Sequence, residues 1–94
     1  MKKMKTLKQQ SYKALIYDEI EEYEEAIDFL TNELNESPLN SILLNNRGLA
    51  FWEIGKNDKA LEDLTKAFKI NPNDTSIQYC YNGLIEHIEN LKNE

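Results

Sequence analysis

A self-similarity at an interval of 34 residues constrains this chain more than any other feature of its sequence. Pro38 and Pro72 lie that far apart, and the same shift superposes Ala26 on Ala60. It also superposes apolar or small residues elsewhere: Ala14 on Gly48, Leu15 on Leu49, Ile20 on Ile54, Ile27 on Leu61, Leu30 on Leu64, and Leu34 on Phe68. A repeated unit of this length cannot bury its apolar face alone, so neighbouring units stack and share one core. The sequence therefore predicts a stack of short repeated units.

The spacing of apolar residues within each unit is helical. They recur at three- and four-residue steps, as from Ile27 to Leu30, which is the period of an amphipathic α-helix. Gly55 is suited to end one helix, and Asn40 and Asp74, which follow the two prolines, are suited to cap the helices that come next. Five helices are predicted, at residues 8–20, 23–36, 41–54, 57–70 and 75–92.

The second unit carries a family resemblance. Residues 44–51 read LNNRGLAF, and Ala60, Leu64, Ala67 and Pro72 follow them. This pattern resembles the signature of the tetratricopeptide repeat (TPR), W-x2-L-G-x2-Y…A-x3-F…P, and the 34-residue interval matches as well. The resemblance implies an all-α fold, an α-solenoid of antiparallel helix pairs with about five helices.

The resemblance covers nearly the whole chain. It implies a basic N-terminal tail at 1–6, a first repeat at 7–40, a second repeat at 41–74 and a C-terminal capping helix at 75–94. The first repeat departs from the family pattern at Gln10 and Lys13, where apolar residues are usual, and at Glu21, where a turn glycine is common. These departures weaken the expected packing of its first helix.

The final helix has an apolar stripe that can serve two purposes. Ile77 begins a strict 4-3-4-3 spacing, which continues through Tyr81, Leu84, Ile88 and Leu91. Such a stripe can cover the open face of the second repeat, which a short array needs for stability. The same spacing is typical of a coiled-coil seam. The helix is therefore either a cap or the seam of a homodimer, formed by Tyr81, Leu84, Ile88 and Leu91.

The residues that could carry catalysis or bind a metal are few and far apart. Cys80 is the only cysteine and His87 the only histidine, and they lie about 10 Å apart along the axis of one predicted helix. A nucleophile and its base must lie within about 3 Å of each other, so this pair does not form a catalytic site. The sequence also lacks zinc-ligand spacings, a calcium loop and a glycine-rich phosphate loop. We therefore expect no enzyme activity, no cofactor and no metal.

The charge of the chain argues against two classes of partner. Its formal net charge of −6 repels nucleic-acid phosphates and anionic membrane surfaces. No apolar run is long enough to span a membrane, and the lone Cys80 suits a reducing compartment, so we expect a cytoplasmic protein. The acidic residues from Asp18 to Glu36, with no basic residue among them, are either a solvated face or a docking surface for a basic partner.

In the TPR family, the first helices of successive repeats line a concave groove that holds extended or helical peptides. The resemblance implies that seven residues carry partner binding in this groove: Leu15, Glu19, Asn45, Leu49, Trp52, Glu53 and Tyr79. Further lining residues are Lys8, Ser11, Asp18, Ile42, Gly83, Glu86 and His87. Trp52 follows the packing aromatic Phe51, so the two side chains cannot face the same core. Trp52 either faces the groove, as hot-spot tryptophans often do, or packs against the final helix.

The expected function is recognition of another protein. The chain would bind a peptide or helix of its partner in the concave groove, as an adaptor or co-chaperone-like module. Some members of the family grip a C-terminal carboxylate with Lys, Arg and Asn side chains, but only Asn46 matches that set here. An apolar anchor flanked by basic residues therefore suits the groove better. The alternative is a structural unit that self-associates through its C-terminal helix.

Overall fold

The architecture comes from a computed structural model, which describes the backbone of residues 12–93 and the side chains of residues 19–93. Within that range the chain forms helices and no strands, which confirms the predicted all-α fold. The helices are α1 (Tyr12–Glu36), α2 (Ser41–Glu53), α3 (Asn57–Ile70) and α4 (Thr75–Lys92). The predicted bounds of α3 and α4 are confirmed, and α2 ends one residue earlier than predicted. The tail at 1–6 and residues 7–11 lie outside the described residues.

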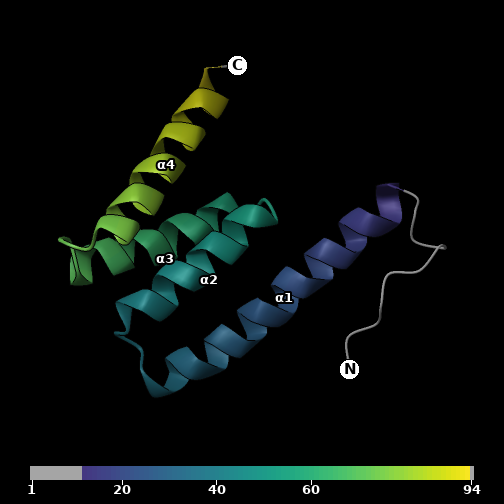
Figure 1. The fold of residues 1–94 in the computed structure, drawn as a ribbon. Helices are drawn as coiled ribbons and strands as arrows, with labels where there is room; N and C mark the ends of the chain where they lie inside the picture. The colour runs from purple at the N-terminus through teal and green to yellow at the C-terminus, as the bar shows by residue number, and fades with distance from the viewer. Residues whose placement is uncertain (1–11, 94) are drawn as a thin grey trace.

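The N-terminal part of the chain differs from the prediction. The helices expected at 8–20 and 23–36 are one continuous helix, α1, which spans 25 residues. The described range therefore holds four helices rather than five. Glu21 and Glu22 are good helix formers, and neither glycine nor proline interrupts the segment around them. Figure 1 shows the consequence, because the N-terminal half of α1 projects away from the other three helices.

The α2–α3 pair is an antiparallel hairpin closed by a glycine turn. Gly55 has a φ of +82°, a backbone conformation that side chains with a Cβ rarely adopt. Its N–H donates to the carbonyl oxygen of Trp52 at 2.9 Å, and the N–H of Lys56 donates to that of Phe51 at 2.9 Å. These bonds satisfy carbonyls at the end of α2 that have no partner within the helix.

Two of the predicted N-caps are confirmed. The Asn40 side-chain oxygen accepts from the backbone N–H groups of Ile42 at 3.0 Å and Leu43 at 3.1 Å, at the start of α2. The Asp74 carboxylate accepts from the N–H of Ile77 at 3.1 Å, at the start of α4. Both side chains therefore satisfy backbone donors that a helix leaves free at its first turn.

A polar contact ties α1, α2 and α3 together. Arg47 of α2 donates from Nε to Asp63 Oδ2 at 2.7 Å and from Nη2 to Oδ1 at 2.9 Å. Its Nη1 donates to Thr31 Oγ1 of α1 at 3.1 Å. Asp63 is buried, and the pKa of Arg47 is raised, first by the hydrogen bond to Asp63 and further by the charges of Asp63 and Glu62. The guanidinium thus stays charged beside a buried carboxylate.

The core has two parts. One part joins all four helices, through Leu34, Leu44, Ala67 and Ile77. The other part lies under α4, where the fully buried residues Ala60, Leu64 and Leu84 pack with partly buried neighbours: Phe51, Trp52, Leu61, Cys80, Tyr81 and Ile88. α4 therefore covers α3 over much of its length.

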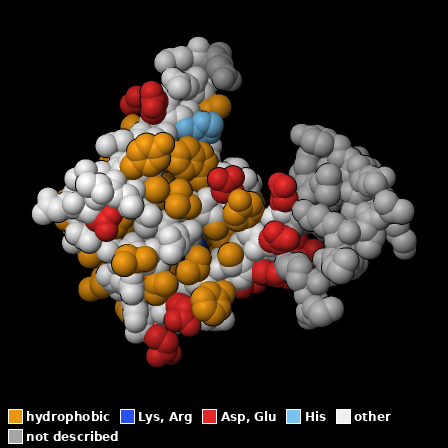
Figure 2. Space-filling view, viewed as in Figure 1, with side chains coloured by type: hydrophobic (Ala, Val, Ile, Leu, Met, Phe, Trp, Pro, Cys, Tyr) orange, Lys and Arg blue, Asp and Glu red, His pale blue; other side chains and the backbone are white. Residues whose placement is uncertain are grey.

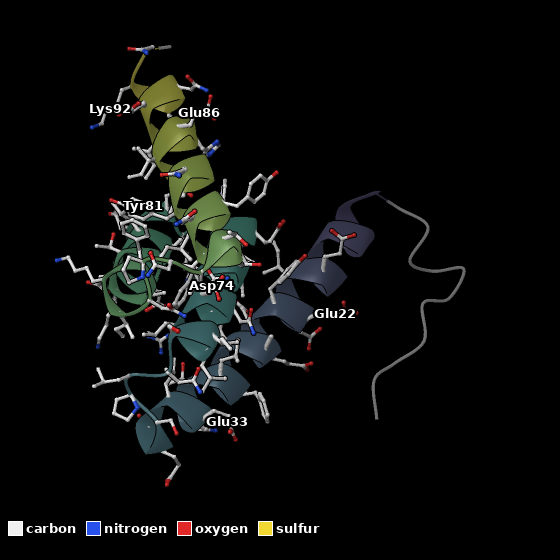
Figure 3. All side chains as sticks on the ribbon, turned by 60° about the vertical axis from the view of Figure 1, so that its left-hand side comes forward. Glu22, Glu33, Asp74, Tyr81, Glu86 and Lys92 are labelled. Carbon is white, nitrogen blue, oxygen red and sulfur yellow. The ribbon has the colours of Figure 1, made fainter. Side chains whose placement is uncertain are left out.

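The residues of the possible dimer seam lie largely inside this core. Leu84 is fully buried, and Ile88 packs beside it. The Tyr81 ring stacks on Phe68 of α3, with ring centroids 4.8 Å apart and planes 2° from parallel (Figure 3). Of the four seam residues only Leu91 is exposed. This packing favours the capping role of α4.

Candidate functional site

A hollow of about 430 Å³ lies between α2 and α4. Its lining residues are half apolar and half polar. Four come from α2 and four from α4 or its N-cap: Ile42, Asn45, Asn46, Leu49, Asp74, Ser76, Ile77 and Cys80. α3 runs antiparallel to α2 and leads back to the start of α4, so that α2 and α4 run in roughly the same direction (Figure 1). Figure 2 shows hydrophobic side chains gathered over the region where α2 and α4 lie, with acidic side chains along α1 beside it.

The hollow brings together part of the predicted groove. Asn45 and Leu49 line it, and so does Ile42, which is 61% exposed at its edge. Tyr79 lies on α4, 82% exposed, and is not among the lining residues. Glu53, at the C-terminal end of α2, is exposed.

The α1 residues of the predicted groove are placed differently. Glu19 is exposed on the half of α1 that projects, apart from the hollow (Figure 1). The side chain of Leu15 lies outside the described side chains. Because α1 does not fold back, the described side chains of the hollow come from α2, α4 and the Asp74 cap alone.

Trp52 packs against α4. A Cβ atom added to Gly83 of α4 would lie 3.3 Å from Trp52 Cη2. The centroid of the Trp52 ring is 5.8 Å from that of the His87 ring, also on α4. Trp52 also packs against the part of the core formed by Ala60 and Leu64. Of the two interpretations of Trp52, the structure therefore places this side chain in the interface with the final helix.

Asn45 has an unusual environment for an amide. It is 7% exposed, and its Nδ2 donates to Cys80 Sγ across the hollow at 3.8 Å. Its Oδ1 is buried and accepts no hydrogen bond from any described residue. A buried acceptor without a partner costs about 1–3 kcal/mol relative to one that is satisfied. The wall of the hollow therefore contains a buried amide whose acceptor oxygen has no hydrogen-bond partner among the described residues.

The electrostatic character of the hollow is mildly acidic. Asp74 is its one charged lining residue among those described, and its carboxylate is held by the Ile77 N–H. Sequence reasoning did not find Ser76, Ile77 or Cys80 as lining residues. The spacings of Ser76 and Cys80 from Asp74 repeat those of Ile42 and Asn46 from Asn40, and this is the signal that could have found them; Ile77 has no such counterpart in the lining.

Two features of the described residues bear on metal binding and on membrane insertion. No three His, Cys, Asp or Glu side chains in this part of the chain gather into a group that could hold a metal ion. None of the helices between residues 12 and 93 is both long and apolar enough to cross a membrane.

Comparison with known proteins bears on the α2–α3 hairpin. The sequence model of the tetratricopeptide repeat family matches residues 41–74, which hold α2, the glycine turn and α3. Residues 41–74 are thus a match to one tetratricopeptide repeat (TPR). In this repeat Gly48 of α2 lies against Leu64 and Asp63 of α3, and both Gly48 and Ala60 are buried.

One curated relative is a heat-shock protein cognate (HSC) co-chaperone from Aspergillus fumigatus. It is 41% identical to this chain over 51 residues, which cover 54% of this chain and 15% of the fungal protein. No solved structure matches the chain. The matched repeat supports a module for protein–protein interaction.

Proposed function

We propose that this chain binds a peptide or helix of a partner protein in the hollow between α2 and α4, as an adaptor or co-chaperone-like module. The unpartnered Oδ1 of Asn45 carries the proposal, because it is a buried acceptor beside the apolar lining residues Ile42 and Leu49. That oxygen has almost no exposed area, so the Asn45 side chain would turn toward the hollow on binding and accept from a backbone N–H of the ligand. An apolar side chain of the ligand would cover Ile42, whose exposure leaves apolar area to bury.

The charge of the hollow supports a neutral or basic ligand segment. No described lining residue is Lys or Arg, so nothing in the described lining would compensate an acidic tail or a terminal carboxylate. Asp74 lies in the lining, and the whole chain carries a net charge of −6, which attracts basic flanking residues. The ligand we propose is therefore an apolar residue with basic neighbours.

The name of the fungal relative supports one part of the proposal. Its name describes a co-chaperone, and its matched region amounts to 15% of its length. A co-chaperone-like role and a cytoplasmic location for the present chain are therefore part of the proposal.

Photo-crosslinking tests whether the hollow is the binding surface. A photoreactive residue placed at Asn46, which is exposed in the lining, is expected to capture a partner from the source cell. The matched control places the same residue at Glu62, which is exposed on α3 and is not a lining residue of the hollow. A partner captured at Glu62 and not at Asn46 would show that the hollow is the wrong surface.

The role of Asn45 is tested on the captured partner. Asn45→Leu removes the unpartnered oxygen while keeping a similar volume, so the fold should persist and binding should weaken by about 2–10-fold, the value of one hydrogen bond. Asn82→Leu makes the same substitution at an exposed position of α4 and serves as the control. Equal affinity of the two variants, measured by calorimetry, would contradict the proposal.

A further inference from the structure

One face of α1 is open where the equivalent face of α3 is closed. In the 34-residue register, Ala26 and Leu30 of α1 correspond to Ala60 and Leu64 of α3. Ala60 and Leu64 are fully buried, whereas Ala26 is exposed and Leu30 is half-buried. Beside them, Phe29 is 62% exposed. The repeat therefore predicts a covering element at a place where the structure leaves apolar side chains in water.

The repeat also identifies what should cover this face. α3 is covered by α2, and Gly48 approaches it so closely that an added Cβ would lie 3.2 Å from Cβ of Asp63. The sequence equivalent of α2 is residues 7–19, nearly the segment 8–20 for which a helix was predicted, and in it Ala14 corresponds to Gly48. In this structure the segment's described part, residues 12–20, continues α1 and leads away from Phe29 (Figure 1).

We propose that a second copy of this chain supplies the missing cover. Segment 8–20 of each copy would pack on the face formed by Ala26, Phe29 and Leu30 of the other, in an exchanged dimer with two-fold symmetry. In the α2–α3 hairpin, Gly48 lies opposite Asp63. The equivalent pair in the dimer is Ala14 of one copy and Phe29 of the other, and with this pairing the two α1 helices run antiparallel. The two-fold axis then passes between Glu21 and Glu22.

The charges along the chain complement each other in this arrangement. Before the acidic stretch begins, the chain carries five basic residues: Lys2, Lys3, Lys5, Lys8 and Lys13. In the antiparallel arrangement the N-terminal part of one copy, where these basic residues occur in the sequence, would run beside the acidic half of the partner helix. Opposite charges placed in this way favour the antiparallel pair of helices over the parallel pair.

The charges at the crossing point of the two α1 helices destabilise the dimer. Glu21 and Glu22 are exposed, and Figure 3 shows Glu22 on the projecting half of α1, with Glu33 on the half beside α2. Four carboxylates would approach one another at the two-fold axis, so the basic segments and the burial of Phe29 must offset their repulsion.

A fold-back within one chain would cover the same face. It would require a turn at Glu21 and Glu22, where the equivalent residues are Gly55, with its φ of +82°, and Lys56. Because Glu21 has a Cβ and favours helix, the turn is costly and the straight helix persists. Exchange between two copies covers the face without breaking α1.

A disulfide trap distinguishes the two arrangements. The variant carries Ala14→Cys and Phe29→Cys, with Cys80→Ser to remove the native thiol. On a single straight helix the two cysteines are about 22 Å apart, too far for a disulfide, whose Cα atoms lie within about 7 Å. We expect a covalent dimer on a non-reducing gel. An intrachain disulfide, or none, would overturn the exchange.

A turn transplant gives the second test, on the full chain without new cysteines. Residues 21–24 are replaced by the Gly-Lys-Asn-Asp sequence of residues 55–58, which should let the segment fold back and leave a monomer. The control Glu21→Ala/Glu22→Lys makes the same charge change at the crossing but keeps the helix, so it should remain dimeric. Light scattering measures both variants and the unmodified chain. A monomeric unmodified chain up to about 1 mM, or a transplant that stays dimeric, would overturn the proposal.

Discussion

Gly48 and Gly83 are both helical glycines, yet replacing each with alanine should change stability in opposite directions. At Gly48 the added Cβ would lie 2.8 Å from Leu64 Cδ2, 2.9 Å from its Cγ and 3.2 Å from Asp63 Cβ. Leu64 is fully buried in the core, so it has little freedom to move. At Gly83 the nearest atom is Cη2 of Trp52, at 3.3 Å, and this ring is partly exposed. It can shift by the few tenths of an ångström that the methyl group needs.

The magnitudes follow from two opposing effects. Alanine in a helix interior is favoured over glycine by about 1 kcal/mol at both positions. Overpacking a rigid core costs about 1–3 kcal/mol, which applies to Gly48 because the clash involves two atoms of a buried side chain. Gly48→Ala should therefore lower the free energy of unfolding by about 1 kcal/mol. Gly83→Ala should raise it by about 0.5–1 kcal/mol, because the higher helix propensity of alanine then acts without an overpacking cost.

Thermal unfolding followed by circular dichroism measures the difference. In a domain of this size 1 kcal/mol corresponds to a Tm change of about 4–8 °C. We expect Gly48→Ala to melt several degrees below the unmodified chain and Gly83→Ala to melt a few degrees above it. Denaturant titration at constant temperature provides an independent value of the same free energies. Equal Tm shifts for the two variants would refute the reasoning, because helix propensity alone would then account for both.

Two further predictions concern polar contacts of the TPR. Arg47→Ala leaves the buried Asp63 carboxylate unpaired and removes the bond to Thr31, so chemical denaturation should show a loss of about 3 kcal/mol. A loss below about 1 kcal/mol would mean that the pair contributes no more than a surface ion pair. Asn40→Ala removes the cap of α2 and should cost about 1 kcal/mol in the same assay, whereas Asn73→Ala, at an exposed loop position, should cost almost nothing.

The sequence predicted the TPR and the final helix well because local and non-local signals agree there. Gly55 lies at the turn that its φ requires, and the caps Asn40 and Asp74 lie where α2 and α4 begin. In α1 the two signals disagree. The 34-residue register predicts a turn at Glu21, while the local sequence favours helix, and the local preference determines the structure.

The candidate site was predictable only where the family pattern fixes which face of a helix points inward. Asn45 and Leu49, two residues of the predicted groove, line the hollow. Trp52 could not be placed from the sequence, because its environment depends on how closely α4 approaches at Gly83. The bond between Arg47 and Asp63 joins residues 16 positions apart on two helices, and neither periodicity nor a motif encodes it.

The two ends of this short helical array differ, and the difference separates its two proposed surfaces. At the C-terminal side α4 closes the core through Leu84, and the hollow lies on the α2–α4 face. At the N-terminal side the open residues Ala26 and Phe29 belong to α1, which contributes no described residue to the hollow. Exchange through α1 would therefore leave both hollows of a dimer free. A partner with two suitable segments would then bind both copies, and linkage alone would raise its apparent affinity by about 10²–10⁴-fold when the spacing fits.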